Sequence, residues 1–168
     1  DLASKSLAEE RGACPDAEEY GIKERFSNKT AIAPTASISI ICGGSSPGIE
    51  PIAANSFTHK TLSGSFNVRN KYLKKILKKY NKDTDEVWST ITTNQGSVSH
   101  LNFLTADEKD TFKTAFEIDQ RWIIELGADR TPHISQAQSI NVFVPADIHK
   151  KELHDIHFQA WKKGLKSL

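Results

Sequence analysis

Two short runs of this chain are apolar on neighbouring residues rather than in strict alternation. The first covers residues 31–33, and the second covers residues 140–144 and is apolar except at Asn141. Each run is followed by a proline, Pro34 or Pro145, which cannot donate to a strand ladder. Strands of this composition are usually covered on both faces, as in a parallel sheet or a barrel. Two strands cannot close a barrel, so the pattern predicts an α/β fold that needs further strands beside them.

The length of 168 residues suits one domain or one large piece of a domain. The chain contains no methionine and begins and stops within expected helices, so we expect a piece of a longer polypeptide. Its 22 lysines and arginines nearly balance 21 aspartates and glutamates, which argues against a dedicated nucleic-acid binder. The chain has no apolar run long enough to cross a membrane and no signal-peptide core at its start. We expect a cytoplasmic protein that associates with no membrane and does not bind DNA directly.

Helices and a hairpin are expected around the two apolar runs. Apolar positions at helical spacing predict helices over residues 2–11, 70–80 and 105–127, and from residue 147 to near the end. Thr105 and Glu108 have the spacing of a capping box at the start of the third helix. Residues 57–62 and 65–68 flank Ser63-Gly64, a pattern that predicts a β-hairpin.

The most suggestive place for chemistry begins at Pro34, where an expected strand ends and small hydroxyl residues follow at an expected helix start. Free backbone amides at a helix N-terminus favour an anion. Hydroxyls from Thr35, Ser37 and Ser39 add hydrogen-bond donors, and the small Ala36 permits close approach of a ligand. The segment therefore reads as a phosphate cradle. The alternative is that Thr35 or Ser37 only caps the helix.

A glycine-rich loop over residues 43–48 has the G-x-x-x-x-G spacing of a nucleotide-binding P-loop. Ile49 and Glu50 stand where that motif needs a lysine and a serine or threonine to hold phosphates and magnesium. The sequence therefore excludes a P-loop and predicts a tight backbone reversal packed near the cradle.

The remaining reactive side chains do not form a recognisable metal motif. Cys14 and Cys42 are too few for a zinc site, and we expect reduced, packed thiols, with a disulfide as the alternative. His154 and His157 share a face of the last helix with His149 nearby, so a metal pair is geometrically conceivable. A solvated helix face is the expected explanation, and no metal site is predicted.

Five segments, taken in order, resemble the large catalytic subunit of ribonucleotide reductase. They are Ala-Pro-Thr-Ala-Ser at 33–37, Ser-Pro-Gly-Ile-Glu-Pro at 46–51, and the segments at 58–66, 136–143 and 160–166. Any one motif is weak, but the ordered set is specific and spans about residues 7–168. The resemblance implies that residues 1–168 form the C-terminal portion of the ten-stranded α/β barrel domain of that family.

The resemblance also assigns a substrate site. In that family the Pro-Thr-Ala-Ser turn and the following helix start hold the phosphates of the ribonucleotide. Carried over by position, the contacts are Thr35, Ala36, Ser37 and Ile38, with Ser39 as a neighbour. Ile38 replaces a hydroxyl residue often found there, so its contact would be made by its backbone amide alone. The implied activity is reduction of ribonucleoside diphosphates to deoxyribonucleotides for DNA synthesis, by radical chemistry.

The catalytic and redox cysteines of the family, and its nucleotide effector sites, lie upstream of this portion, and neither Cys14 nor Cys42 matches them. We therefore expect no catalytic residue, metal or cofactor in residues 1–168, and no activity of this chain alone. The resemblance implies three kinds of partner: the N-terminal remainder of the large subunit, a small subunit with a radical-generating metal cofactor, and thioredoxin or glutaredoxin as reductant.

The subgroup is indicated by the hairpin run Thr-His-Lys-Thr-Leu-Ser-Gly at 58–64, which favours class I. In class I, two radical-relay tyrosines follow the segment that resembles residues 164–168, where this chain stops. Ser135 also stands where many relatives have Asp, and His133 where many have Tyr or Phe. Two alternatives stay open: a fragment of a cobalamin-dependent class II reductase, and a non-catalytic nucleotide- or phosphate-binding module.

Overall fold

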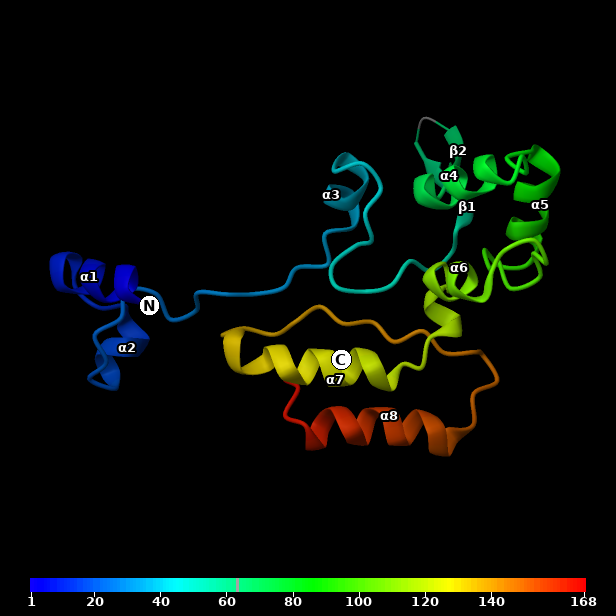
Figure 1. Ribbon diagram of the computed structural model, residues 1–168. Coiled ribbons are helices and arrows are strands. Elements are labelled where there is room, and N and C mark those ends of the chain that lie inside the picture. The colour runs from blue at the N-terminus through cyan, green and yellow to red at the C-terminus, as the bar shows by residue number, and fades with distance from the viewer. Residues whose placement is uncertain (63) are drawn as a thin grey trace.

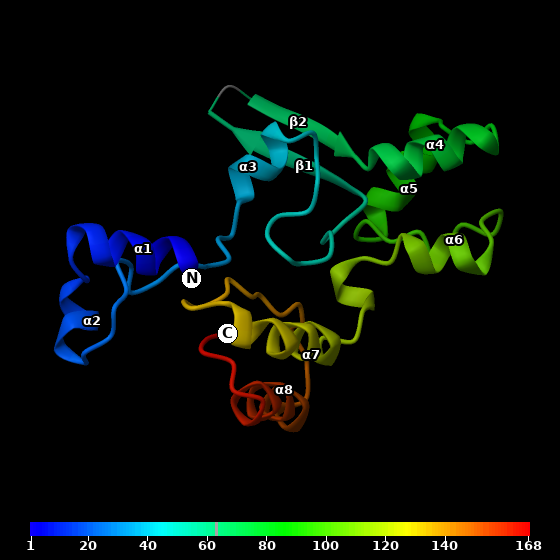
Figure 2. The ribbon, with the colours of Figure 1, turned by 60° about the vertical axis from the view of Figure 1, so that its left-hand side comes forward.

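The computed structural model describes residues 1–62 and 64–168 and is mainly helical with one small sheet. The elements in chain order are α1 (Leu2–Arg11), α2 (Pro15–Glu19), α3 (Ala36–Ile41), β1 (Ser56–Thr61), β2 (Gly64–Arg69), α4 (Lys71–Lys79), α5 (Asp85–Thr93), α6 (Ala106–Thr111), the 3-10 turn η1 (Ala115–Glu117), α7 (Arg121–Arg130), the 3-10 turn η2 (Thr131–His133) and α8 (Lys150–Lys162). Figures 1 and 2 show an open arrangement: α1 and α2 lie apart from the rest, α4, α5 and α6 lie near one end of the hairpin, and α7 lies along α8. Every helix of the described chain is too short or too polar to span a membrane.

The predicted hairpin is confirmed by antiparallel pairing of β1 with β2. Phe57 lies opposite Val68, and His59 lies opposite Phe66, so these four side chains share one face. The predicted turn residue Ser63 lies outside the described residues.

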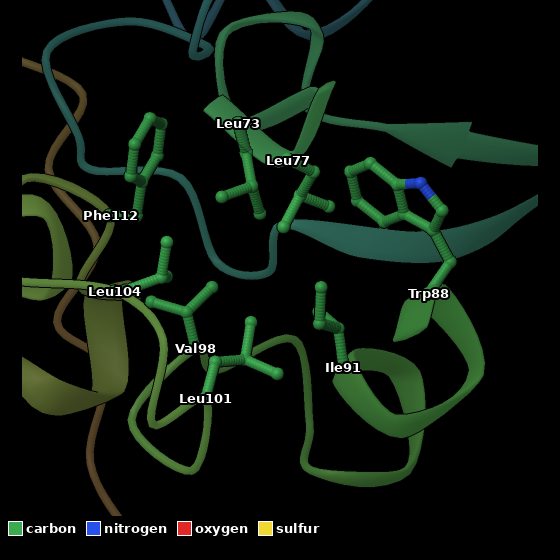
Figure 3. Packing of buried hydrophobic residues seen from close by; sticks show 8 residues of the cluster. All are labelled: Leu73, Leu77, Trp88, Ile91, Val98, Leu101, Leu104 and Phe112. Atoms are coloured by element: carbon green, nitrogen blue, oxygen red, sulfur yellow. The ribbon is translucent and has the colours of Figure 1, made fainter. Parts of the chain in front are cut away.

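The larger core is built on α4, whose expected bounds of 70–80 are close to the observed ones. The Asn70 side chain caps the helix by accepting hydrogen bonds from the amides of Tyr72 and Leu73. The apolar stripe then buries Leu73 and Leu77 completely, while Tyr72 stays exposed. Figure 3 shows the other members of this cluster converging on them: Trp88, Ile91, Val98, Leu101, Leu104 and Phe112. Fully burying a side chain of this size contributes about 1.5–3 kcal/mol.

The single helix expected over 105–127 is wrong, because the chain makes three shorter pieces there: α6, η1 and α7. The capping box of Thr105 and Glu108 is confirmed, but α6 ends at Thr111. Thr114 and Glu117 then form a second capping box, and the Ala115 amide donates to the Ile52 carbonyl at 2.9 Å. This bond to a distant loop turns the chain out of the helical path.

The expected helix stop at Gly127 is also wrong, since α7 continues to Arg130. A Cβ atom at Gly127 would lie 3.0 Å from Ile140 Cδ1, so glycine here permits the close approach of the segment around Ile140. Helix α7 packs on α8 through the buried Ile124, Ile156 and Ala160. The last helix begins at Lys150, a few residues later than expected.

The first apolar run lies parallel to residues 136–139, the segment just before the second run, and neither run forms a regular strand in the described chain. One isolated parallel bridge joins Ile32 to Gln138, and the Ser139 amide donates to the Ile32 carbonyl at 2.9 Å. Ala31 and Ala33 are exposed, so the expectation of a run covered on both faces is wrong for these residues. The pairing stays limited to one bridge because no further strand of the described chain lies beside these two segments. A longer ladder would need neighbouring strands on its open edges.

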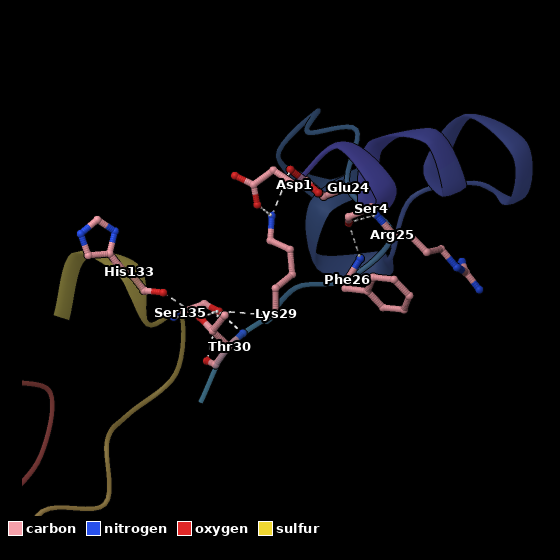
Figure 4. A network of polar contacts seen from close by, with 9 residues as sticks. All are labelled: Asp1, Ser4, Glu24, Arg25, Phe26, Lys29, Thr30, His133 and Ser135. Atoms are coloured by element: carbon pink, nitrogen blue, oxygen red, sulfur yellow. Dashed lines mark hydrogen bonds and ion pairs between the residues drawn. The ribbon is translucent and has the colours of Figure 1, made fainter. Parts of the chain in front are cut away.

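A polar network joins α1 to residues 24–30 and joins these in turn to the segment around Ser135 (Figure 4). The Ser4 hydroxyl accepts from the amides of Arg25 and Phe26, and Lys29 forms an ion pair with Glu24 at 3.3 Å. At the far end, Ser135 Oγ accepts from the amides of Lys29 and Thr30, both at 2.9 Å. Residue 135 therefore acts as a hydrogen-bond acceptor, a task that an aspartate carboxylate performs equally well.

Candidate functional site

The candidate site is the turn between Pro34 and α3, and its backbone is unusual at Thr35. Thr35 occupies the position before α3 with φ 51° and ψ 30°, the left-handed region. A β-branched residue rarely adopts this conformation, which costs on the order of 1–3 kcal/mol and persists only where surrounding contacts hold it. One such contact is present: the Gly48 amide donates to Thr35 Oγ1 at 2.7 Å.

The glycine-rich loop over residues 43–48 packs directly against the turn, as predicted, and so brings the Gly48 amide to Thr35. A Cβ atom at Gly48 would lie 3.5 Å from the Pro34 carbonyl oxygen and 3.6 Å from that of Ala33, and Gly48 has φ +59°. The other end of the loop is held by Lys71, whose Nζ donates to the Gly43 carbonyl at 2.7 Å. The loop is therefore a support for the turn.

Three backbone amides at the start of α3 are free. Within the described chain, the amides of Ala36, Ser37 and Ile38 have no hydrogen-bond acceptor, and all three residues are exposed. The next amide, that of Ser39, closes the helix by donating to the Thr35 carbonyl. Because α3 has only six residues, its macrodipole is small, and these three amides provide most of the local attraction for an anion.

The three hydroxyls of the turn have different surroundings. Thr35 Oγ1 accepts from Gly48 and keeps its own proton to donate, and Ser37 is exposed with no described partner. Ser39 is buried and donates to the Ala36 carbonyl at 2.7 Å. The alternative of simple capping fails, because no side chain caps α3. The turn thus offers three amides and two hydroxyls to a ligand, and Ser39 supports it from inside.

An open groove of about 430 Å³ lies between the loop that follows Gly48 and helix α7. Its walls are largely apolar, with contributions from Ile49, Trp122 and Leu126. Glu50 and Arg130 are the charged residues in its lining. Sequence reasoning missed Glu50, whose buried carboxylate accepts hydrogen bonds from Asn141, because its partner lies far along the chain.

The described residues contain no cluster of three histidine, cysteine or acidic side chains that could hold a metal ion. His154 and His157 are exposed on α8, and His149 is exposed at its N-cap, which fits the expected solvated face. The ring of His154 stacks on Phe158. The two cysteines are free thiols, but the expectation of packed thiols is wrong for Cys42, which is exposed.

Comparisons with known proteins agree over almost the whole chain. A family model described as "Ribonucleotide reductase, barrel domain" matches residues 5–168. The chain is 52% identical over 162 residues to the ribonucleoside-diphosphate reductase large subunit of Invertebrate iridescent virus 6, which covers 94% of this chain and 17% of that protein. It is 42% identical over 166 residues to a putative large subunit from Frog virus 3, covering 99% of this chain and 29% of that protein.

A solved structure gives the same match in three dimensions. The alpha subunit of a class Id ribonucleotide reductase from Actinobacillus ureae superimposes with a TM-score of 0.80 at 36% identity. The superposition covers 98% of this chain and 29% of that subunit. The chain therefore spans less than a third of the length of each of these three proteins.

Proposed function

Because the chain belongs to the ribonucleotide reductase barrel-domain family, we propose that it works as part of the large subunit of a class I ribonucleoside-diphosphate reductase and holds the substrate phosphates. The observation that carries the phosphate role is the turn itself. Three free amides, from Ala36, Ser37 and Ile38, lie beside the hydroxyls of Thr35 and Ser37. Such a set of outward donors matches the acceptor oxygens of a phosphate group.

The chemical contribution of this turn is positioning. A phosphate anchored on Thr35 and Ser37 fixes the attached ribose relative to groups that react with it, which lowers the entropic part of the barrier. The amide of Ile38 contributes a donor although its side chain has no hydroxyl. Ser39 contacts no ligand in this proposal, because its proton is given to the Ala36 carbonyl.

The rest of the reaction needs other parts of the enzyme. We assign the radical and redox cysteines and the nucleotide effector sites to the remainder of the large subunit. The metal cofactor that generates the radical belongs to a small subunit, and thioredoxin or glutaredoxin serves as the reductant. The chain alone is then expected to show no turnover.

The test uses a complete large subunit that carries this segment, assayed with its small subunit and a ribonucleoside diphosphate. Thr35→Val and Ser37→Ala should each raise KM by about tenfold or more, the effect of losing a hydrogen bond to a charged group. Ser45→Ala, which changes an exposed serine of the neighbouring loop, should leave KM unchanged.

Four outcomes would contradict parts of the proposal. An unchanged KM in both turn variants would remove the phosphate role, and turnover by this chain alone would remove the dependence on other segments. Nucleotide binding without reduction by the complete complex would favour a non-catalytic phosphate-binding module. A requirement for cobalamin in place of the small subunit would favour class II.

A further inference from the structure

The backbone pairing beside the turn stops abruptly, and side chains replace it. The Ser139 amide donates to the Ile32 carbonyl, so a continued parallel ladder would offer the Pro34 carbonyl to Asn141 two residues later. Instead the Asn141 amide donates to Glu50 Oε1 at 2.7 Å. The next alternate amide, that of Phe143, donates to Gln120 Oε1 at 2.8 Å. Two side-chain oxygens therefore replace backbone carbonyls as acceptors for residues 141 and 143, beyond the point where the other segment turns away at Pro34.

Glu50 is the more tightly bound of these two acceptors. Its side chain is buried, and Oε1 accepts from both the backbone amide and the side-chain Nδ2 of Asn141, the latter at 2.6 Å. Hydrogen bonds to a carboxylate are stronger than neutral ones, and a buried carboxylate without partners would be costly. The pair therefore anchors the loop around residue 50 to the segment around residue 141.

This anchor leads directly to the candidate phosphate turn. Glu50 follows Gly48 by two residues, and the Gly48 amide donates to Thr35 Oγ1. We propose that Glu50 is a positioning residue: by binding Asn141 it fixes the loop whose Gly48 amide holds Thr35 left-handed, so that the amides of residues 36–38 face the substrate phosphate. This inference rests on the proposed function and extends it to a residue that touches no ligand.

Gln120 provides the matched control. It supports the same segment through the Phe143 amide, but it belongs to the region just before α7 and has no bond to the loop at Gly48. Loss of Gln120 should weaken the packing of residues 139–144 without releasing Thr35. Loss of Glu50 should release Thr35.

The experiment measures KM, kcat and thermal unfolding of the complete large subunit with its small subunit. Glu50→Leu should raise KM for the nucleoside diphosphate by about tenfold with kcat within about twofold, because phosphate binding is remote from the reacting atoms. Glu50→Gln should restore KM, since both bonds end on one oxygen that an amide also provides. Gln120→Leu should lower the unfolding temperature and leave KM unchanged.

The inference would be overturned if Glu50→Leu lowered the stability and kcat but left KM unchanged. A purely structural role of Glu50 would give that result. If Glu50→Leu does not fold, the inference is tested with Asn141→Ala, which removes the side-chain donor to Glu50 and keeps the backbone amide. It should raise KM by about threefold, and an unchanged KM would overturn the inference. The double variant of Thr35→Val and Glu50→Leu should raise KM no more than the stronger single change, whereas independent effects would multiply.

The assay also separates this inference from the proposed function. If Thr35→Val raises KM and Glu50→Leu does not, the positioning role fails while the phosphate turn stands. If neither raises KM, the phosphate turn itself is wrong.

Discussion

Thr35 and Gly48 illustrate how much a single residue of this protein depends on another that is distant in sequence. The hydroxyls of the turn follow from the sequence, as does a glycine in the neighbouring loop. The left-handed conformation of Thr35 does not, because threonine disfavours it and only the bond from Gly48 explains it. The role of Ser39 also differs from the one expected from the sequence. Its hydroxyl donates to the Ala36 carbonyl and is therefore not offered to a ligand.

His100 is a residue whose charge should control stability. Its Nδ1 atom is buried without a described partner, and its Nε2 lies 3.0 Å from Thr90 Oγ1. Burial, and secondarily the charge of Lys109, lowers the pKa of His100 below its usual 6.5. Between those two pKa values the unfolded chain binds a proton that the folded chain does not.

We therefore expect the free energy of unfolding to fall as the pH drops below about 6.5. The carboxylates of Glu108 and Glu117 act in a more acidic range. Because their pKa values are lowered from 4.5, the stability that they contribute is lost mainly as the pH falls below 4.5. Chemical denaturation of this chain at several pH values measures the slope. His100→Gln should flatten the slope in that window, and an equal slope in both proteins would contradict the assignment.

At the scale of elements, local patterns were reliable where one helix or hairpin contained its own signals. The helix at 2–11, the capped helix α4 and the hairpin agree with their expected positions. Helix α5 was missed although Thr84 caps it and Asp85 and Glu86 fill its first turn. The helix expected over 105–127 failed because the bond from Ala115 to Ile52 is a contact between distant segments.

Gly96 follows α5 and lies against the segment before β1, where its carbonyl accepts from the Asn55 amide. This position should not tolerate a side chain. It has φ +83°, and a Cβ atom there would lie 2.3 Å from Ala54 Cβ and 2.6 Å from Ala54 Cα. Gly12 also has φ +83°, but open space surrounds it. Gly96→Ala should therefore combine backbone strain with a clash and destabilise by about 3 kcal/mol or more. Gly12→Ala should cost the backbone strain alone, about 1–3 kcal/mol, because φ +83° with ψ 157° is a conformation that essentially only glycine adopts.

Thermal unfolding of both alanine variants, followed by circular dichroism, measures this difference. Equal losses would mean that the contact between Gly96 and Ala54 relaxes at little cost.

At the scale of the whole molecule, the described residues form two separate apolar clusters. The cluster around Leu73, Leu77 and Trp88 is larger than the one between α7 and α8, and α1 with α2 lies apart from both (Figures 1 and 2). Stability is therefore expected to differ along the chain, because local opening is easiest where few apolar groups are buried.

Native-state hydrogen exchange of this chain tests that expectation. Amides of α4 and α5 should exchange most slowly, those of α7 and α8 faster, and those of α1 and α2 fastest. Uniform protection throughout would instead indicate a single cooperative core.

The amino-acid sequence by itself indicated the family, the location of the candidate phosphate turn, and the elements α1, α4 and the hairpin, whose signals lie within a few residues of one another. The tertiary structure alone decided the conformation of Thr35, the inward bond of Ser39, the interruption of the helix after Thr111 and the place of Glu50. These features depend on bonds such as that between Glu50 and Asn141, whose partners are 91 residues apart. A local pattern holds no record of such a contact, because it forms only when the folded chain brings its distant segments together.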